Sequence, residues 1–323
     1  MNMDVLWLSQ DEVKGLLDMD TAISAVENAF REYALGTAKM PPKTYLYFDK
    51  GDLRVMPSHL DGIASTKIVN VHTGNRQRGI PTVMALLVVN SPDTGQPLCV
   101  MDGTYITDIR TGAAGGVATR YMARKGSKVV GIFGAGAQAR TQVLAISKVL
   151  DIEKVLVTCP LKGCADAFIS EMSAALDTSI VFASPEEVCE CDVLITTTPS
   201  RTPVVKSEWV RDGTHINAIG ADAKGKQELD STTLKRARVV VDDYTQATHS
   251  GEVNVPTSQG VFTREDNAGT LGDVVAGKLA GRTSDDEITV FDSTGLAVQD
   301  AACALVVYEG AKREGVGSWM RLF

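Results

Sequence analysis

The spacing of hydrophobic positions changes partway along the chain, and the change divides the sequence into two regions. In the first region, Ser9 and Glu12 fit a capping box that opens a short helix, and a second helix follows that Asp20 can cap and Gly36 can end. From residue 43 to residue 102 the pattern becomes short apolar or alternating runs separated by turns, which is typical of strands. This region is expected to form an antiparallel sheet with flanking helices.

The second region begins with a helical segment, residues 104–124, after which strand and helix patterns alternate. The candidate strands are KVVGIF, KVLVTC, SIVFA, DVLITTT, THINAIG, RVVVD and EITVFD. This alternation predicts an α/β fold with a doubly wound parallel sheet of the Rossmann type. A last helix, about residues 296–312, is expected to return to the first domain. The predicted domains are an α+β domain of residues 1–112 with about 300–323, and a Rossmann domain of residues 113–299.

Composition and charge exclude several classes of protein. The chain has 323 residues, 44% of them hydrophobic, which is enough for two domains with sizeable cores. A net charge of −8 argues against nucleic acid as the main partner, although it does not exclude a local basic pocket for a small acid. No apolar stretch is long enough for a transmembrane helix and no secretory signal is seen, so we expect a cytoplasmic protein without a membrane partner.

The cysteines and histidines give little support for a metal site. None of the six cysteines forms a CxxC pair, and the four histidines lack HExxH spacing. Reduced thiols are the expected state in a chain of this length. Cys189 and Cys191 could bind a metal only with ligands from elsewhere in the chain, and we predict no metal ion.

The stretch VVGIFGAGAQAR, residues 129–140, carries the clearest chemical signal. Gly134, Gly136 and Ala139 fit the GxGxxG/A pattern between an apolar strand and a helix. The first glycine allows a tight turn, the second lets the backbone approach a pyrophosphate, and the small third residue lets helix pack on strand. An incidental glycine-rich turn is the alternative, but the surrounding strand and helix patterns favour a dinucleotide site.

The residues leave the choice between NAD and NADP open. An Asp or Glu at the end of the second strand usually binds the ribose 2′-hydroxyl of NAD. Here that strand runs into VTCPLK without an acid. Lys162 could instead contact the 2′-phosphate of NADP, or it could be a solvated helix residue.

Four basic residues lie where a small acid could bind. Lys43, Arg54 and Lys67 are near strand ends in the first region, and Arg110 precedes the domain crossing. Lys67 has apolar neighbours in a strand that should be partly buried, and a buried cation needs an anion. Arg110 is followed by TGAAGG, which has almost no side chains and suits close approach of a cofactor or of another backbone.

Polar residues also end two strands of the predicted parallel sheet. Asp222 follows the strand THINAIG, at the sheet edge where ligands of open α/β sheets bind. It could bond a substrate amine, transfer a proton, or cap a turn. Ser293 and Thr294 end another strand and could reach a nicotinamide or cap the next helix.

Seven stretches spread over nearly the whole chain carry a resemblance to a known family. They are MPPKTYL, GIPTVMALLVVNSPDTGQPL, DIRTGAAGG, GAGAQA, CDVLITTTPSRTPV, HINAIGADAKGKQELD and FDSTGLAVQD. In this order they resemble the ornithine cyclodeaminase/mu-crystallin family, and most closely its alanine dehydrogenase branch. The resemblance implies a homodimer whose first domain contacts the substrate and the partner subunit, and whose second domain binds the dinucleotide.

The resemblance also implies roles for single residues. By motif position Lys67 and Arg110 would hold the substrate carboxylate, with Lys43 and Arg54 nearby. Asp222 would act on the substrate nitrogen or on an attacking water, so Asp222 and Lys67 are the expected catalytic residues. The residues expected to bind NAD or NADP are Thr82, Thr111, Gly134, Gly136, Ala137, Gln138, Ala139, Lys162, Thr197, Asp222 and Ser293.

One departure from the family pattern bears on the substrate. Cyclodeaminases carry a glutamate where this chain has Arg54, in GDLRVMP. Arginine cannot act as a base and would repel a diamine, so it fits a small 2-oxo acid better. The leading hypothesis is a reversible alanine dehydrogenase, which reduces the imine of pyruvate and ammonia by hydride transfer. The alternatives are an ornithine cyclodeaminase, a reductase of cyclic ketimines such as pyrroline-2-carboxylate, and a mu-crystallin-like binding protein without catalysis.

Overall fold

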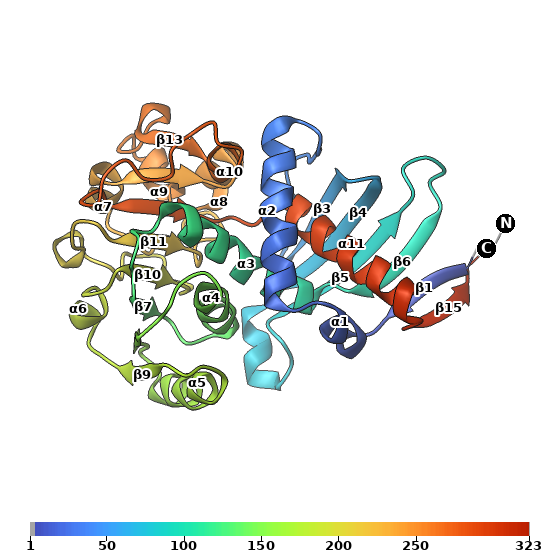
Figure 1. Cartoon of the computed structure of the whole chain (residues 1–323), viewed down its shortest axis with the longest axis horizontal. Coiled ribbons are helices and arrows are strands. Elements are labelled where there is room, and N and C mark those ends of the chain that lie inside the picture. Colours follow the sequence, from blue (N-terminus) through green and yellow to red (C-terminus); the bar gives the residue numbers. More distant parts are fainter. Residues whose placement is uncertain (1–3, 323) are drawn as a thin grey trace. The chain divides into compact units, whose positions relative to one another are not determined.

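The computed structural model describes residues 4–322, with Arg76 described by its backbone alone. By its internal contacts the chain divides into two units, Met1–Arg110 with Leu296–Phe323, and Thr111–Gly295. A seven-stranded sheet forms the centre of the first unit, and an eight-stranded sheet forms the centre of the second (Figure 1). The C-terminal helix α11 (Ala297–Glu314) belongs to the first unit, where it packs on α2 (Met19–Leu35).

The sheet of the first unit has the strand order β15-β1-β6-β5-β4-β3-β2. Its described neighbours pair antiparallel, as expected, except that β1 runs parallel to β6. The edge strand β15 and its neighbour β1 were not expected, because these short segments come from opposite ends of the chain and are recognisable as strands only through their pairing. The strands are β1 (Asp4–Leu8), β2 (Thr44–Phe48), β3 (Gly51–Leu60), β4 (Ile63–Val71), β5 (Val83–Asn90), β6 (Pro97–Asp102) and β15 (Ser318–Arg321).

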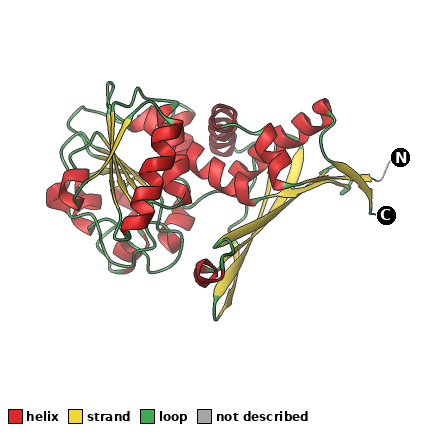
Figure 2. Cartoon of the chain, turned by 90° about the horizontal axis from the view of Figure 1, so that it is seen from below, coloured by secondary structure: helices red, strands yellow, loops and turns green. Residues whose placement is uncertain are grey.

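Helices α1 (Gln10–Leu16), α2 and α11 lie on one face of this sheet, as Figure 2 shows. The predicted capping box of α1 is confirmed, since the Ser9 N–H donates to the Glu12 carboxylate at 2.7 Å. The prediction that Asp20 caps α2 is wrong. Asp18 has the extended backbone that precedes the first turn, and its side chain accepts a hydrogen bond from that turn. Gly36 ends α2 with φ = 79°, as predicted.

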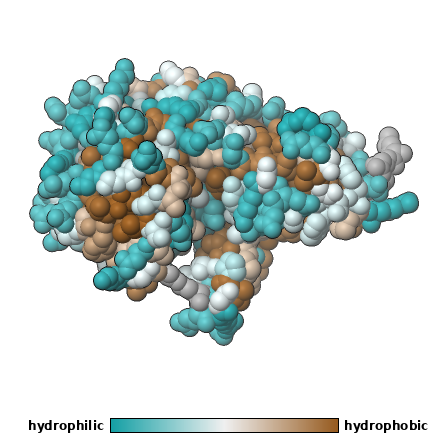
Figure 3. Space-filling model, turned by 60° about the horizontal axis from the view of Figure 1, so that its bottom comes forward, coloured by the Kyte–Doolittle hydropathy of each residue, from teal (hydrophilic) through white to brown (hydrophobic). Residues whose placement is uncertain are grey.

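Side chains of the strands alternate between this helix-covered face and the opposite face. On the helix-covered face Met56 and Lys67 lie in register and are both buried. On the opposite face Val55, Ile68 and Leu86 form a row across three strands, and Leu86 is 39% exposed. Apolar patches also interrupt the polar surface in the view of Figure 3. The alternation therefore places Lys67 inside the first unit and leaves an apolar row at its surface.

The second unit is a doubly wound Rossmann fold, as predicted. Its described strands all run parallel in the order β13-β12-β14-β11-β10-β7-β8-β9. The seven expected strands are present, whereas β13, with the sequence NAGT, has no apolar run and was not expected. The strands are β7 (Val129–Phe133), β8 (Lys154–Thr158), β9 (Ser179–Phe182), β10 (Val193–Thr196), β11 (His215–Ala218), β12 (Arg238–Val241), β13 (Asn267–Thr270) and β14 (Thr289–Asp292).

Helix α3 (Thr104–Met122) begins in the first unit and ends in the second. Among the helices of residues 4–322, none is both long enough and apolar enough to cross a membrane. The other α-helices of the second unit are α4 (Ala137–Ser147), α5 (Lys162–Ala175), α6 (Pro185–Val188), α7 (Ser231–Arg236), α8 (Tyr244–Ser250), α9 (Asn254–Ser258) and α10 (Leu271–Val275). The 3-10 helices of the chain are η1 (Thr73–Arg78), η2 (Ser207–Trp209) and η3 (Arg264–Asp266).

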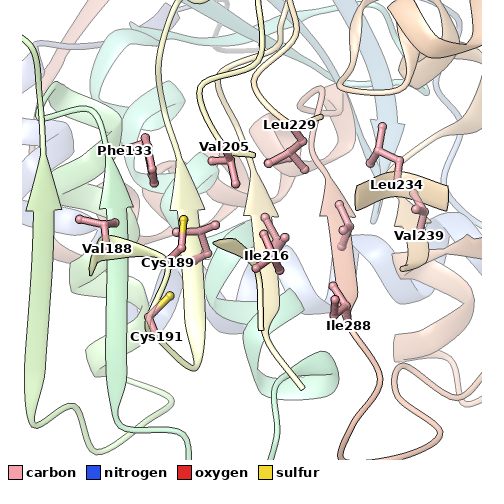
Figure 4. Packing of buried hydrophobic residues seen from close by; sticks show 14 of the residues in the cluster. Phe133, Val188, Cys189, Cys191, Val205, Ile216, Leu229, Leu234, Val239 and Ile288 are labelled. Carbon is pink, nitrogen blue, oxygen red and sulfur yellow. The ribbon is translucent and has the colours of Figure 1, made fainter. Parts of the chain in front are cut away.

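Hydrophobic cores lie on both faces of the parallel sheet. Ile132 joins the core beneath α4 and α5, and Phe133, which points to the other side, joins the second core. Cys189 and Cys191 belong to this second core, where Figure 4 shows them among apolar side chains. Burial raises the pKa of Cys189 to about 12. Both cysteines therefore serve as buried apolar groups, and the described residues contain no cluster that could hold a metal.

Candidate active site

The glycine-rich turn joins β7 to α4. Gly134 has φ = +99°, a conformation that favours glycine, and its N–H donates to the Thr158 carbonyl at 2.9 Å. A Cβ atom at Gly134 would lie 2.8 Å from Oγ1 of Thr197. That threonine hydroxyl donates to the Phe133 carbonyl at 3.1 Å, so the end of β10 supports the turn.

Gly136 is the N-cap of α4 and has no side chain to cap the first turn. A Cβ atom at this position would meet no heavy atom within 4 Å. The surroundings of Gly136 are therefore open on this side, and the helix dipole favours an anion at this end of α4. Ala137, Gln138 and Ala139 form this first turn. The turn fits the pyrophosphate of a dinucleotide.

Arg140 holds this turn from the helix side and was not among the predicted site residues. Its Nη1 atom donates to the carbonyls of Ala135 and Gly136 at 2.8 and 3.0 Å. Its Nε atom pairs with Glu171 on α5, and its guanidinium lies over the Phe168 ring, 5.6 Å from the centroid. The side chain thus connects the turn to the neighbouring helix. An arginine one turn into the helix was the only signal in the sequence.

Asp222 lies four residues beyond β11 and forms an ion pair with Lys226. The loop that carries it is held by Glu228, which is completely buried. The N–H groups of Thr198 and Gly220 donate to the two carboxylate oxygens of Glu228 at 2.5 and 2.8 Å. Glu228 therefore connects the loops that follow β10 and β11. It was not predicted, because a glutamate in a polar stretch usually indicates an exposed residue.

Ser293 and Thr294 follow β14 and were expected to reach a nicotinamide or cap the next helix. The capping alternative is wrong, because the N-cap of α11 is Leu296. The Thr294 hydroxyl donates to the Asp242 carboxylate at 2.9 Å. The Ser293 hydroxyl is buried and has no hydrogen-bond partner within residues 4–322.

The run TGAAGG after Arg110 packs against α4. A Cβ atom at Gly112 would lie 2.5 Å from the Thr141 carbonyl oxygen, and one at Gly115 would lie 1.9 Å from Oε1 of Gln142. The Nε2 atom of Gln142 donates to the carbonyl of Thr111 at 2.8 Å. Of the two alternatives for this run, the structure therefore shows close approach of another backbone.

Three of the residues expected along the cofactor are distant in sequence from the glycine turn. Thr82 precedes β5 in the first unit and accepts a hydrogen bond from the His72 N–H at 2.8 Å through its carbonyl. Thr111 is the first residue of the second unit and is 8% exposed. Lys162 is the first residue of α5 and is exposed.

In the first unit, Lys67 and Arg110 meet at a carboxylate. Lys67 on β4 and Arg110 on α3 are 1% and 6% exposed. Lys67 Nζ and Arg110 Nε both donate to Oδ1 of Asp300 on α11, at 2.7 and 2.9 Å. Arg110 Nη1 also donates to Oε1 of Gln299 at 3.2 Å. The structure therefore brings together the two cations that the sequence singled out, and adds an acid that was not predicted.

Burial lowers the pKa of the Lys67 ammonium to about 7. The neighbouring Arg110 and Lys43 contribute to this decrease. Asp300 opposes them by charge and by its hydrogen bond. The Lys67 side chain can therefore hold or release a proton near neutral pH.

Arg54 lies on the same sheet face as Lys67 and is 7% exposed. Its Nε and Nη2 atoms donate to the two carboxylate oxygens of Asp52 at 2.6 and 3.2 Å. The guanidinium also lies 5.6 Å from the centroid of the Tyr45 ring. Asp52 thus balances the charge of Arg54.

Comparison with known proteins shows similarity over nearly the whole chain. The sequence profile of the ornithine cyclodeaminase/mu-crystallin family matches residues 3–315. The alanine dehydrogenase of Archaeoglobus fulgidus is 56% identical over 322 residues, 99% of this chain and 99% of that protein. A solved archaeal alanine dehydrogenase dimer with bound NAD has a TM-score of 0.97 and 56% identity, over 99% of this chain and 100% of that chain. The Delta(1)-pyrroline-2-carboxylate reductase of Thermococcus litoralis was solved with NADH and L-proline. It has a TM-score of 0.95 and 41% identity, over 97% of this chain and 99% of that chain.

Proposed function

Since the chain belongs to the ornithine cyclodeaminase/mu-crystallin family, we propose that it is an NAD(P)-dependent alanine dehydrogenase. It acts on C=N and CH–NH2 groups and interconverts alanine with pyruvate and ammonia. The observation that carries the proposal is the buried pair of Lys67 and Arg110, two cations at one internal carboxylate. The similarity to the Archaeoglobus enzyme, 56% over 99% of the chain, supports the choice of alanine.

Lys67 and Arg110 bind the substrate carboxylate. Two positive charges next to the single charge of Asp300 leave one positive charge for a further carboxylate. Pyruvate and alanine each carry one carboxylate, which suits this balance. A fixed carboxylate leaves the substrate little freedom to lose at the transition state.

The glycine turn and the N-terminus of α4 hold the dinucleotide. NAD(P), when bound, supplies the hydride chemistry. The α4 N–H groups bind its pyrophosphate, and Thr197 and Ser293 complete the site. Asp222 holds or moves the proton at the substrate nitrogen, and Lys226 orients its carboxylate.

NAD is the proposed physiological cofactor. The two solved relatives described above carry NAD and NADH, and at 56% and 41% identity they are close to this chain. Lys162 is exposed at the start of α5 and leaves a route for NADP. Comparing NADH with NADPH in the assay below decides between them.

A homodimer is the proposed assembly. The apolar row of Val55, Ile68 and Leu86 lies on the sheet face opposite α2 and α11, and burying such a row against a second copy stabilises a dimer. The archaeal relative of known structure is a dimer. The proposed location is the cytoplasm, in keeping with a sequence whose six cysteines include no CxxC pair.

The experiment that tests the function follows the absorbance of NADH or NADPH with pyruvate and ammonium. Ammonium-dependent oxidation is expected, faster with NADH. Arg110→Met should lose most of kcat/KM for pyruvate, while Arg120→Met, an exposed arginine on the same helix, serves as the matched control. If neither dinucleotide is oxidised by wild type, the proposal is wrong.

Reduction of pyrroline-2-carboxylate is the second candidate. It is favoured by the 41% identity to the Thermococcus litoralis reductase. Lys67 and Arg110, which together form the substrate clamp, would hold the single carboxylate of the cyclic imine. Oxidation of NADH by the cyclic imine at higher kcat/KM than by pyruvate and ammonium would favour this candidate.

A further inference from the structure

Asp300 is a buried acid at the centre of the first unit. It lies in the first turn of α11, and its side chain is 1% exposed. Its Oδ1 atom accepts hydrogen bonds from Lys67 on β4 and Arg110 on α3. Its Oδ2 atom is buried and has no hydrogen-bond partner in the described part of the chain. Three elements that are distant in sequence thus converge on one carboxylate oxygen.

The titratable groups that act on Lys67 include two further cations, Arg110 and Lys43. Arg110 lies on α3 and Lys43 before β2, whereas Asp300 and the Cys303 thiol lie on α11. The Arg54–Asp52 ion pair lies on the same sheet face as Lys67. Burial raises the pKa of Cys303 to about 12, so its thiol is neutral. Asp300 is therefore the negative charge in direct contact with Lys67. Without it, burial and the nearby arginine would both favour the neutral amine.

We propose that Asp300 is a positioning residue of the substrate clamp. It holds the Lys67 ammonium and the Arg110 guanidinium side by side, and it keeps the ammonium charged up to neutral pH. Lys67 and Arg110 then present two donors in a fixed geometry to the substrate carboxylate. The proposal depends on the proposed function only in naming pyruvate or alanine as the bound anion.

Asp300→Asn tests this role, because it keeps the shape of the side chain and removes its charge. We measure kcat/KM for pyruvate in variant and wild type between about pH 5 and 9. The ratio of the two values cancels the pH dependence of free ammonia. The decrease of kcat/KM at high pH should begin roughly one to three pH units lower in the variant than in wild type. The ratio of variant to wild type should therefore fall about tenfold or more as pH rises. A ratio that is the same at every pH would indicate a packing role and overturn the proposal.

Thermal unfolding tests the same role without enzyme activity. Below about pH 6 Lys67 is charged and paired with Asp300 in wild type, whereas in the variant it is either neutral or charged without its acid. Near pH 8 Lys67 is largely neutral in both proteins. The stability deficit of Asp300→Asn should therefore be largest in acid and decrease toward pH 8. In a Lys67→Met background this pH dependence should disappear, because the titrating amine is absent.

Asp192→Asn is the matched control in the second unit. Asp192 also pairs with an arginine, Arg124, and its pKa lies below the ordinary 3.8, so its deficit should not vary between about pH 6 and 8. If the stability deficit of Asp300→Asn were equally independent of pH, the proposal would be overturned. The stability deficit could show the expected pH dependence while wild type does not turn over pyruvate. That result would refute alanine dehydrogenation and leave the role of Asp300 intact.

Discussion

A methyl group added at Gly136 or at Gly112 should have opposite effects, because the surroundings differ. At Gly136 a Cβ atom has no heavy atom within 4 Å, and φ = −88° suits any residue. At Gly112 a Cβ atom would lie 2.5 Å from the Thr141 carbonyl oxygen, a backbone atom of α4. Gly136→Ala should therefore weaken ligand binding, whereas Gly112→Ala should weaken the fold.

The stability of Gly136→Ala should equal that of wild type. Alanine is a poorer N-cap than glycine by roughly 0.5–1 kcal/mol. Reduced freedom of the unfolded chain offsets this by about 0.4–1 kcal/mol. Binding should change more, since the methyl group occupies the approach to the α4 N–H groups. Loss of one hydrogen bond to a charged group costs about 1.5–3 kcal/mol, or roughly ten- to hundredfold in Kd.

The stability of Gly112→Ala should decrease. Overpacking against α4 costs about 1–3 kcal/mol. The better helix propensity of alanine returns up to about 1 kcal/mol. The net loss of about 1–2 kcal/mol corresponds to roughly 2–8 °C in Tm for a unit of this size.

The assays are fluorescence titration with NADH and thermal unfolding, on both variants. For Gly136→Ala we expect weaker NADH binding with an unchanged Tm. For Gly112→Ala we expect a lower Tm with unchanged NADH affinity. Unchanged NADH affinity in Gly136→Ala would refute the assignment of this turn to the pyrophosphate. An unchanged Tm in Gly112→Ala would refute the close helix contact.

Three further predictions concern single residues of the second unit. Asp222→Asn should lower kcat for pyruvate by roughly a hundredfold or more with NADH affinity unchanged, and full turnover would contradict its role with the proton. Arg140→Gln removes the donors to the carbonyls of Ala135 and Gly136, so titration should show roughly three- to tenfold weaker NADH binding at unchanged kcat. Burial lowers the pKa of His215 from 6.5 to about 3. The unfolded chain therefore takes up the proton first as pH falls below 6.5, and stability falls by up to about 1.4 kcal/mol per pH unit. His215→Asn should flatten this acid slope of Tm against pH, and an identical slope in both proteins would contradict it.

Local patterns in the sequence predicted much of the fold. The capping box at Ser9, the glycine that ends α2 and the alternating strands are set by residues a few positions apart, and all are confirmed. The Rossmann fold and the family were also predicted correctly, because the glycine turn lies in a regular strand–helix alternation. The cap of α2 was assigned two residues too late, since Asp18 and Asp20 are chemically alike and only the backbone distinguishes them.

Pairing between distant segments could not be predicted in this way. Strands β1 and β15 are recognisable only together, and β13 is a strand only because β12 lies beside it. Glu228 looks like a surface residue until the loops after β10 and β11 surround it.

The clamp shows where the two kinds of information meet. The apolar neighbours of Lys67 indicated from the sequence that a buried cation needs an anion, because charge in a low-dielectric interior is costly without a partner. The packing of α11 against β4 decided which acid supplies that partner. It places Oδ1 of Asp300, 233 positions away in sequence, 2.7 Å from Nζ of Lys67. The need for a counter-charge is a property of the residue and its neighbours in sequence, whereas the identity of the counter-charge is a property of the packed structure.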